Sequence, residues 1–320
     1  MRRYLVFTLK AAVSAALLYL AVAGIDTAIL GERLQGLKYE WIAAAVGLVV
    51  VQVLLQSLRW MEVSSACDAS LPLQHAVRFS LTANFFYQVL PSTLGGDAMR
   101  VLLFARSGTD LAKATYSVLL DRFVSLLSLV VVVLACLPWT LELIQNPIGR
   151  SALLAIAAGS ASAAVAFVTI GYLPWRWLQS WQPTRHLMHI SRIAREFILS
   201  AKASGLAMTT SVGIQVAAAA TAWCAARAVD VPFGFLPALQ LVPPIMLIAS
   251  FPISVAGWGV RETSLALAFG YAGLLETDGF LVSVLIGAVT LAVGIVGGLQ
   301  WLAGMDQAEK AGDAATRPPR

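Results

Sequence analysis

The sequence contains few charged residues. Of its 320 residues, 12% are Asp, Glu, Lys or Arg, whereas 59% are hydrophobic. A soluble domain carries roughly 25% charged residues, which it needs to cover a surface that faces water. The shortage excludes a soluble globular enzyme and indicates a protein embedded in a membrane.

Cysteine and histidine are also scarce. The three cysteines, Cys67, Cys136 and Cys224, are odd in number and widely spaced, which excludes a disulfide framework and a CxxC metal site. His186 and His189 lie on one helical turn, but no carboxylate or cysteine accompanies them as a further ligand. We therefore expect neither a metal nor a cofactor.

The sequence contains long apolar runs. At ~20 residues per span, the apolar material suffices for roughly six to eight crossings. The N-terminus resembles a signal peptide, but Lys10 interrupts its apolar run, which continues to Leu30, so we interpret it as a retained helix. We predict full transmembrane helices over residues 4–30, 41–60, 111–137, 151–173, 205–228 and 279–303. Together these make an all-α polytopic domain over residues 1–303, followed by a polar, disordered cytoplasmic tail over 304–320.

Two further apolar segments are interrupted by proline and glycine. The first, over residues 74–106, breaks at Pro91, and the second, over 235–275, breaks at Pro252. In each, an arginine follows the proline by nine residues: Arg100 in the first and Arg261 in the second. Each half of the chain holds two spans, a broken segment and one span. Because three crossings per half is odd, we predict an inverted repeat in which each broken segment forms a re-entrant hairpin.

The two repeats are predicted over about residues 4–137 and about 151–303. The loop over 174–204 carries five basic residues against one acid, Glu196, which places it in the cytoplasm. Because six spans are an even number, both termini then lie on the cytoplasmic side of a bacterial-type inner membrane. The net charge of +5 is explained by such loops, so we expect no nucleic-acid partner. Within this loop, residues 184–203 have the pattern of an interfacial helix beside anionic lipid.

The broken segments are the candidate substrate site. A helix that starts inside the membrane favours an anion at its N-terminal end, and a following arginine adds a bidentate fork suited to phosphate. We predict that two such tips meet near mid-membrane and share one headgroup anion. The candidate substrate-binding residues are Arg100, Arg261, Asn84, Ser92, Ser254, Gly95, Gly96, Gly257 and Gly259.

Adjacent charges, Asp121 and Arg122, lie near the middle of the third predicted span. Adjacent residues point about 100° apart on a helix, so each needs a partner elsewhere. We predict that Asp121 pairs with Arg100 or Arg261, and that Arg122 pairs with Asp97 or Glu262. Asp97, Asp121 and Glu262 would balance the arginines, and one of them could carry a coupling proton. The alternative is a closed structural ion-pair network.

Three motifs in order resemble a known family. They are NFFYQVLPSTLGGDAMR at residues 84–100, the Asp121-Arg122 pair, and PISVAGWGVRE at residues 252–262. Together they resemble the lysylphosphatidylglycerol synthase transmembrane, or flippase-like, family. The resemblance implies a lipid flippase domain, which some members fuse to a soluble aminoacyl transferase. We expect this chain to lack that domain and its lysine-transfer activity; some stand-alone members are associated with hopanoid lipid biosynthesis.

The sequence therefore predicts a flippase, rather than an enzyme, that moves an amphipathic, phosphate-bearing membrane lipid between leaflets. An intramembrane enzyme of hopanoid or aminoacyl-phospholipid biosynthesis is one alternative, and it would need a nucleophile or metal set near mid-membrane. A non-catalytic partner of lipid-biosynthesis enzymes is another, for which the central charges would be dispensable. A small-ion exchanger is the third, and it would need no lateral opening to lipid.

Overall fold

The structure is a computed structural model that describes residues 36–90, 94–171, 182–250 and 259–316. Every regular element in these ranges is an α-helix. The helices are α3 (Tyr39–Ser65), α4 (Leu73–Val89), α5 (Gly95–Arg106), α6 (Leu111–Leu143), α7 (Pro147–Ile170), α9 (Gln182–Leu199), α10 (Ala201–Ala228), α11 (Phe235–Ala249), α12 (Val260–Tyr271) and α13 (Glu276–Thr316).

Five of these helices, α3, α6, α7, α10 and α13, are long and apolar enough to cross a membrane. They coincide with five of the six predicted spans, and the first predicted span lies outside the described residues. Local signals set their ends: the Asp110 carboxylate accepts hydrogen bonds from the first turn of α6, and Asn146 caps α7 just before Pro147. The part of the chain that the structure describes is all-helical, and its long apolar helices are those of a multi-pass membrane protein.

Each predicted broken segment is a pair of shorter helices. α4 and α5 form the first pair and α11 and α12 the second, with residues 91–93 and 251–258 outside the described ranges. Gly259 begins the last helix of the second pair with φ of 86°, a left-handed conformation that favours glycine. The location of both breaks is therefore as predicted from proline and glycine.

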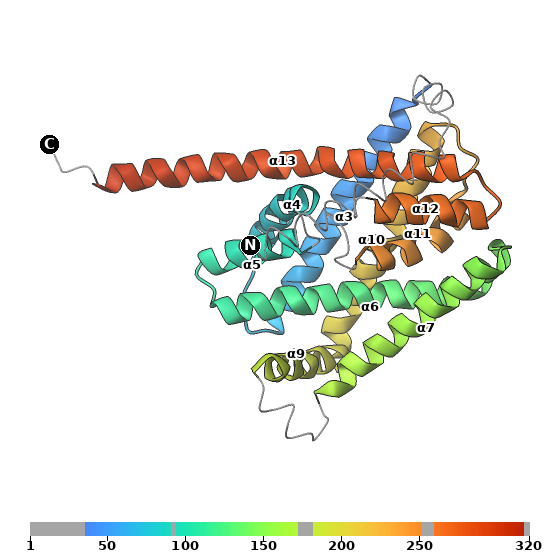
Figure 1. Cartoon of the computed structure of the whole chain (residues 1–320). Helices are drawn as coiled ribbons and strands as arrows, with labels where there is room; N and C mark the ends of the chain where they lie inside the picture. Colours follow the sequence, from blue (N-terminus) through green and yellow to red (C-terminus); the bar gives the residue numbers. More distant parts are fainter. Residues whose placement is uncertain (1–35, 91–93, 172–181, 251–258, 317–320) are drawn as a thin grey trace, which may run out of the picture.

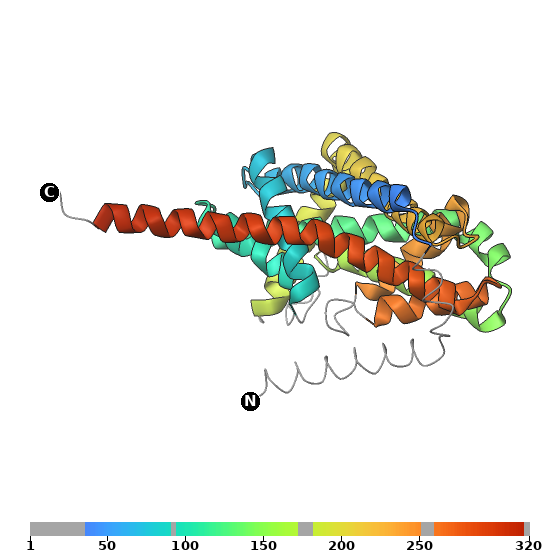
Figure 2. The same ribbon diagram turned by 90° about the horizontal axis from the view of Figure 1, so that it is seen from above.

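The two helix pairs lie toward opposite ends of the bundle (Figures 1 and 2). At one end, Lys38 N donates to Ala228 O at 2.9 Å, and Gln145 N donates to Tyr271 O at 3.0 Å. At the other end, Lys113 Nζ donates to the carbonyl of Asp68 at 3.2 Å. Both termini of the α4–α5 pair therefore lie at the end of the bundle that holds the C-terminus of α3. Both termini of the α11–α12 pair lie at the opposite end, with the N-terminus of α3.

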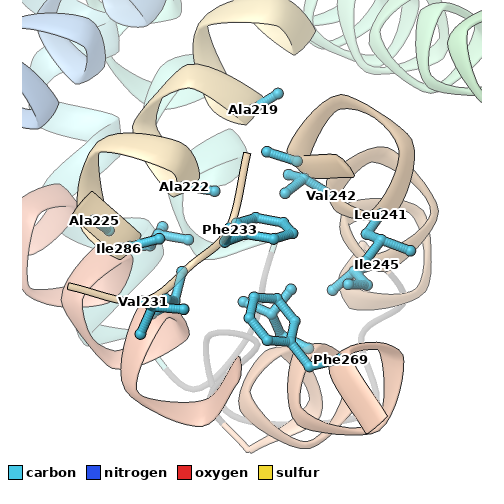
Figure 3. Packing of buried hydrophobic residues seen from close by; sticks show 14 of the residues in the cluster. Ala219, Ala222, Ala225, Val231, Phe233, Leu241, Val242, Ile245, Phe269 and Ile286 are labelled. Atoms are coloured by element: carbon cyan, nitrogen blue, oxygen red, sulfur yellow. The ribbon is translucent and has the colours of Figure 1, made fainter. Parts of the chain in front are cut away.

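The largest apolar core fixes the second pair in place. Alanines of α10 pack against α11, α12 and α13, and the loop residue Phe233 fills the space between these helices (Figure 3). The rings of Phe233 and Phe269 have centroids 4.6 Å apart. Burial of such rings holds α11 and α12 beside the long spans despite their short length.

The first pair is held by close packing of α4 on α13. A Cβ atom at Gly297 would lie 2.0 Å from the carbonyl oxygen of Leu81, and one at Gly294 would lie 3.2 Å from Phe85 Cα. Glycines thus allow the two backbones to approach closely, as in many transmembrane helix contacts. The two halves of the chain are joined through this contact.

Two expectations need correction. The second predicted span, over residues 41–60, leaves Arg59 in its last turn, but α3 continues to Ser65 and Arg59 is 2% exposed in the interior. The disordered tail was predicted from residue 304, but α13 continues as a helix to Thr316. The predicted interfacial helix is confirmed as a helix, α9, whose apolar face, including Phe197, packs on the protein.

Candidate functional site

A polar cavity of about 340 Å³ lies among α3, α4, α6, α10, α11, α12 and α13. Gln52 and Thr290 place it near the middles of the candidate spans Tyr39–Ser65 and Glu276–Ala303. Its polar lining consists of Gln52, Gln56, Arg59, Asn84, Tyr87, Gln88, Arg122, Ser125, Ser250, Arg261 and Thr290. A polar cavity at this depth is costly in a membrane, which makes it the candidate functional site.

Asp121 is the centre of a buried ion-pair network behind this cavity. Its carboxylate accepts from Arg59 Nε at 2.7 Å and from Arg100 Nη2 at 2.8 Å. The guanidinium of Arg100 lies over the ring of Trp60, with 3.9 Å between Cζ and the ring centroid. Arg100 and Asp121 are each 1% exposed, so a ligand in the cavity cannot reach Arg100.

Asp97 is the centre of a second network at the cavity wall. It accepts from Arg122 Nε at 2.9 Å and from the hydroxyl of Tyr87, and it lies 3.7 Å from Arg100. The Arg122 side chain is 31% exposed, compared with 2% for Arg100. Arg122 is therefore the arginine of the first half that a ligand in the cavity can reach most readily.

Arg261 is the cavity arginine contributed by the second half. It donates to the adjacent carboxylate of Glu262 from Nη2 at 2.6 Å, and to Ser283 Oγ from Nε at 3.1 Å. Glu262 is fully buried and also accepts from the backbone N–H of Gly259 at 2.7 Å, which fixes the start of α12. The acid thus orients Arg261 while the arginine side chain, 13% exposed, faces the cavity.

Two amide side chains of α4 reach the cavity with buried atoms that lack a partner. Among the described residues, Asn84 Nδ2 and Gln88 Oε1 have no hydrogen-bond partner. Such atoms cost free energy unless water or a ligand satisfies them. They sit one helical turn apart and supply both a donor and an acceptor to the cavity.

For each of the two mid-span charges, the structure shows one of the two predicted partners. Asp121 pairs with Arg100, and Arg122 pairs with Asp97. The two arginines after the breaks are not equivalent, because Arg261 lines the polar cavity whereas Arg100 is enclosed with Asp121. Of the other predicted residues, Asn84 lines the cavity, and Ser92, Ser254 and Gly257 lie outside the described ranges.

The predicted glycines that the structure describes have a packing role. A Cβ atom at Gly95 would meet Leu90 at 2.6 Å, and one at Gly96 would meet the Tyr87 ring at 2.5 Å. These glycines therefore let α5 pack on the end of α4, and Gly259 supplies the left-handed start of α12. In the part of the chain that the structure describes, no group of three metal-ligating side chains occurs; His186 Nδ1 instead lies 2.6 Å from the hydroxyl of Tyr116.

Sequence reasoning missed Arg59 and two glutamines. Arg59 is absent from the predicted site, although it lies inside an apolar helix and lines the cavity. Gln52, Gln56 and Arg59 follow one another at four and three residues, which places all three on one helix face. That spacing within an otherwise apolar run was the available signal.

Comparison with known families supports the motif resemblance over nearly the whole chain. The lysylphosphatidylglycerol synthase TM region family matches residues 7–298. A comparison with curated proteins gives no significant match. The chain belongs to the lysylphosphatidylglycerol synthase TM region family, and is thus an integral membrane protein related to lipid metabolism.

Proposed function

We propose that this member of the lysylphosphatidylglycerol synthase transmembrane family moves an anionic, phosphate-bearing lipid between membrane leaflets. The observation that carries the proposal is the polar cavity at mid-span, which joins Arg122 of the first half to Arg261 of the second. A lipid headgroup that crosses the membrane needs a polar, charge-complementary site at this depth.

The charge balance of the cluster favours an anion. Among the described residues, four guanidinium groups (Arg59, Arg100, Arg122 and Arg261) face three carboxylates (Asp97, Asp121 and Glu262). A surplus positive charge in a low-dielectric site attracts a counter-charge strongly. A phosphate diester would supply one negative charge and would accept from two guanidinium forks.

The neutral lining completes a headgroup site. Asn84 Nδ2 can donate to a phosphate or glycerol oxygen, and Gln88 Oε1 can accept from a headgroup hydroxyl or amine. Gln52 and Gln56 face the same cavity from α3. The substrate chemistry supported by this set is an anionic centre flanked by hydrogen-bonding groups.

The same proposal includes the topology. We take α4–α5 and α11–α12 as re-entrant hairpins that enter from opposite faces, in two halves of inverted orientation. Their placement at opposite ends of the bundle supports this reading (Figure 1). Arg185, Arg192 and Arg195 of α9 support a cytoplasmic position for the α9 end, because basic loops favour that side. The proposal puts both termini on the same side of an inner membrane.

Reconstitution of the purified chain in liposomes tests the function. Lipids with a fluorescent label and identical chains, one with a phosphatidylglycerol headgroup and one a neutral glycosyl lipid, are scored for leaflet exchange by chemical quenching. We expect accelerated exchange of the anionic lipid and little acceleration of the neutral lipid, relative to protein-free liposomes.

The outcome separates this proposal from its alternatives. Equal acceleration of both lipids would indicate non-specific scrambling, and no acceleration would remove the transport function. Chemical change of the labelled lipid, detected by mass spectrometry of the same samples, would indicate an intramembrane enzyme instead. Loss of acceleration in an Arg261→Gln variant that reconstitutes at the wild-type level would tie exchange to the cavity.

A further inference from the structure

A second, apolar cavity of about 620 Å³ lies between α6 and α7. α6 contributes large side chains, including Leu119 and Phe123. α7 contributes mostly small ones, including Gly159 and Ala163, besides Ile156 and Phe167. α9 and α11 also line it through Leu187 and Leu247. Gly159 and Ala163 are exposed, so the cavity opens along α7 toward the surroundings of the bundle.

The apolar cavity and the polar cavity adjoin. Arg122 and Ser250 line both of them. Arg122 is also held by Asp97, which keeps its guanidinium at the boundary between polar and apolar walls. A molecule with a charged head and a hydrocarbon chain can therefore occupy both cavities at once, with its polar–apolar junction at Arg122.

We propose that the apolar cavity binds a hydrocarbon chain of the transported lipid, and that Arg122 positions the junction between this chain and the headgroup anion. The proposal rests on the proposed function, which supplies the lipid. It adds a chain-binding site, and it makes the small side chains of α7 the residues that determine which chain lengths fit. A bulk membrane lipid that merely fills the opening is the competing occupant.

α7 is suited to a test by substitution. A Cβ atom at Gly159 would meet nothing within 4 Å, so larger side chains can enter the cavity without a clash at their base. In the apolar 18-residue stretch of α7 that could span the membrane, only 11% is buried inside the protein, compared with 61% for the corresponding stretch of α13. Substitutions on α7 should therefore fill the cavity and leave the fold intact.

The experiment measures lipid retention by native mass spectrometry of the purified full chain in detergent. The probes are phosphatidylglycerols with two sixteen-carbon chains or two six-carbon chains, which share a headgroup. The variant Ala163→Phe fills the cavity, and Ala158→Phe places the same side chain on an exposed position of α7 outside the cavity lining. Arg122→Gln removes the proposed junction contact.

For Ala163→Phe we expect at least a tenfold loss of long-chain retention and less than a twofold change for the short-chain lipid. Ala158→Phe should match the wild type with both, and Arg122→Gln should weaken both. Equal long-chain retention in Ala163→Phe and Ala158→Phe, equal loss of both chain lengths in Ala163→Phe, or no long-chain retention by the wild type would overturn the proposal.

Lipid retention in detergent does not require transport. The chain-binding site and the transport function can therefore be refuted independently of each other. Chain-length-dependent binding without leaflet exchange in liposomes would refute the transport function and keep the chain site. Exchange that is selective for the anionic headgroup but indifferent to Ala163→Phe would keep the transport function and refute the chain site.

Discussion

Arg100 Nη2 donates a 2.8 Å hydrogen bond to Asp121 Oδ2, and the other oxygen of the same carboxylate accepts from Arg59. One carboxylate thus joins α3, α5 and α6 behind the polar cavity. Arg59 and Arg100 share the Asp121 carboxylate, and of these two only Arg59 also lines the cavity. Arg122 and Arg261 line the cavity and pair with other carboxylates.

Loss of the Asp121 charge should lower stability strongly. The variant Asp121→Asn leaves Arg59 and Arg100 buried without their shared counter-charge, and breaking a buried pair in this way costs ~3–5 kcal/mol. We expect a clear fall in the midpoint of thermal unfolding in detergent. Asp110→Asn, at the exposed N-cap of α6, is the control, because asparagine also caps helices; an equal midpoint for both variants would contradict the central role of Asp121.

Removal of the unpartnered amides should affect activity and stability in opposite directions. Asn84→Leu and Gln88→Met are close to isosteric and replace buried atoms without a described partner. We expect a gain on the order of 1 kcal/mol in stability, because the cost of the unsatisfied group disappears. Leaflet exchange of the anionic lipid should fall several-fold.

Both properties are measured on the same preparations. Thr209→Val, at an exposed position of α10, should change neither. A loss of stability in the two amide variants together with normal exchange would show that these amides serve the fold rather than the ligand.

The orientation of the two hairpins can be read from cysteine accessibility. Ser107 follows α5 and Leu275 follows α12, and both are exposed. In intact cells, a membrane-impermeant maleimide should label Leu275→Cys and leave Ser107→Cys unlabelled until the membrane is opened. Labelling of both from outside would contradict opposite insertion.

Cys67 should give a low background in this assay. Burial, followed by the negative charge of Asp68, raises the pKa of the Cys67 thiol to about 11. Since the thiolate is the reactive form, only about one thiol in a thousand is reactive at pH 8. Background labelling at Cys67 should therefore stay low at neutral pH.

Close packing of α4 on α13 predicts a position-specific effect of alanine. Gly297→Ala places Cβ 2.0 Å from Leu81 O, a backbone atom that can move only with its helix, so we expect a loss of ~1–3 kcal/mol in stability. Gly47→Ala meets nothing within 4 Å and should gain up to ~1 kcal/mol. Thermal unfolding of both variants checks this, and a stability equal to wild type in Gly297→Ala would contradict the packing.

The sequence predicted those features that depend on the residues of one segment, such as apolar length, a helix break or a charge placed in an apolar span. Long apolar runs predicted five described spans, and proline with glycine predicted where α4 and α11 end. Two adjacent mid-span charges need separate partners, which predicted Arg100 or Arg261 for Asp121 and Asp97 or Glu262 for Arg122. The structure shows the first partner of each.

The remainder depends on how helices pack against one another. Nothing local distinguishes Arg100 from Arg261, because both follow a proline by nine residues and both stand near an acid. Their different exposure results from Trp60 and Asp121, which enclose one of them. The apolar cavity likewise arises from the spacing between α6 and α7, which no periodicity along either helix reveals.

The central claim is that Arg122 and Arg261 together hold a headgroup anion at mid-span. Its most direct test is the ratio of leaflet-exchange rates for an anionic and a neutral lipid of identical chains, measured in liposomes with equal amounts of folded protein. We predict a ratio well above ten for the wild type and a ratio near one for the Arg122→Gln/Arg261→Gln double variant. The same high ratio in the double variant would contradict the account.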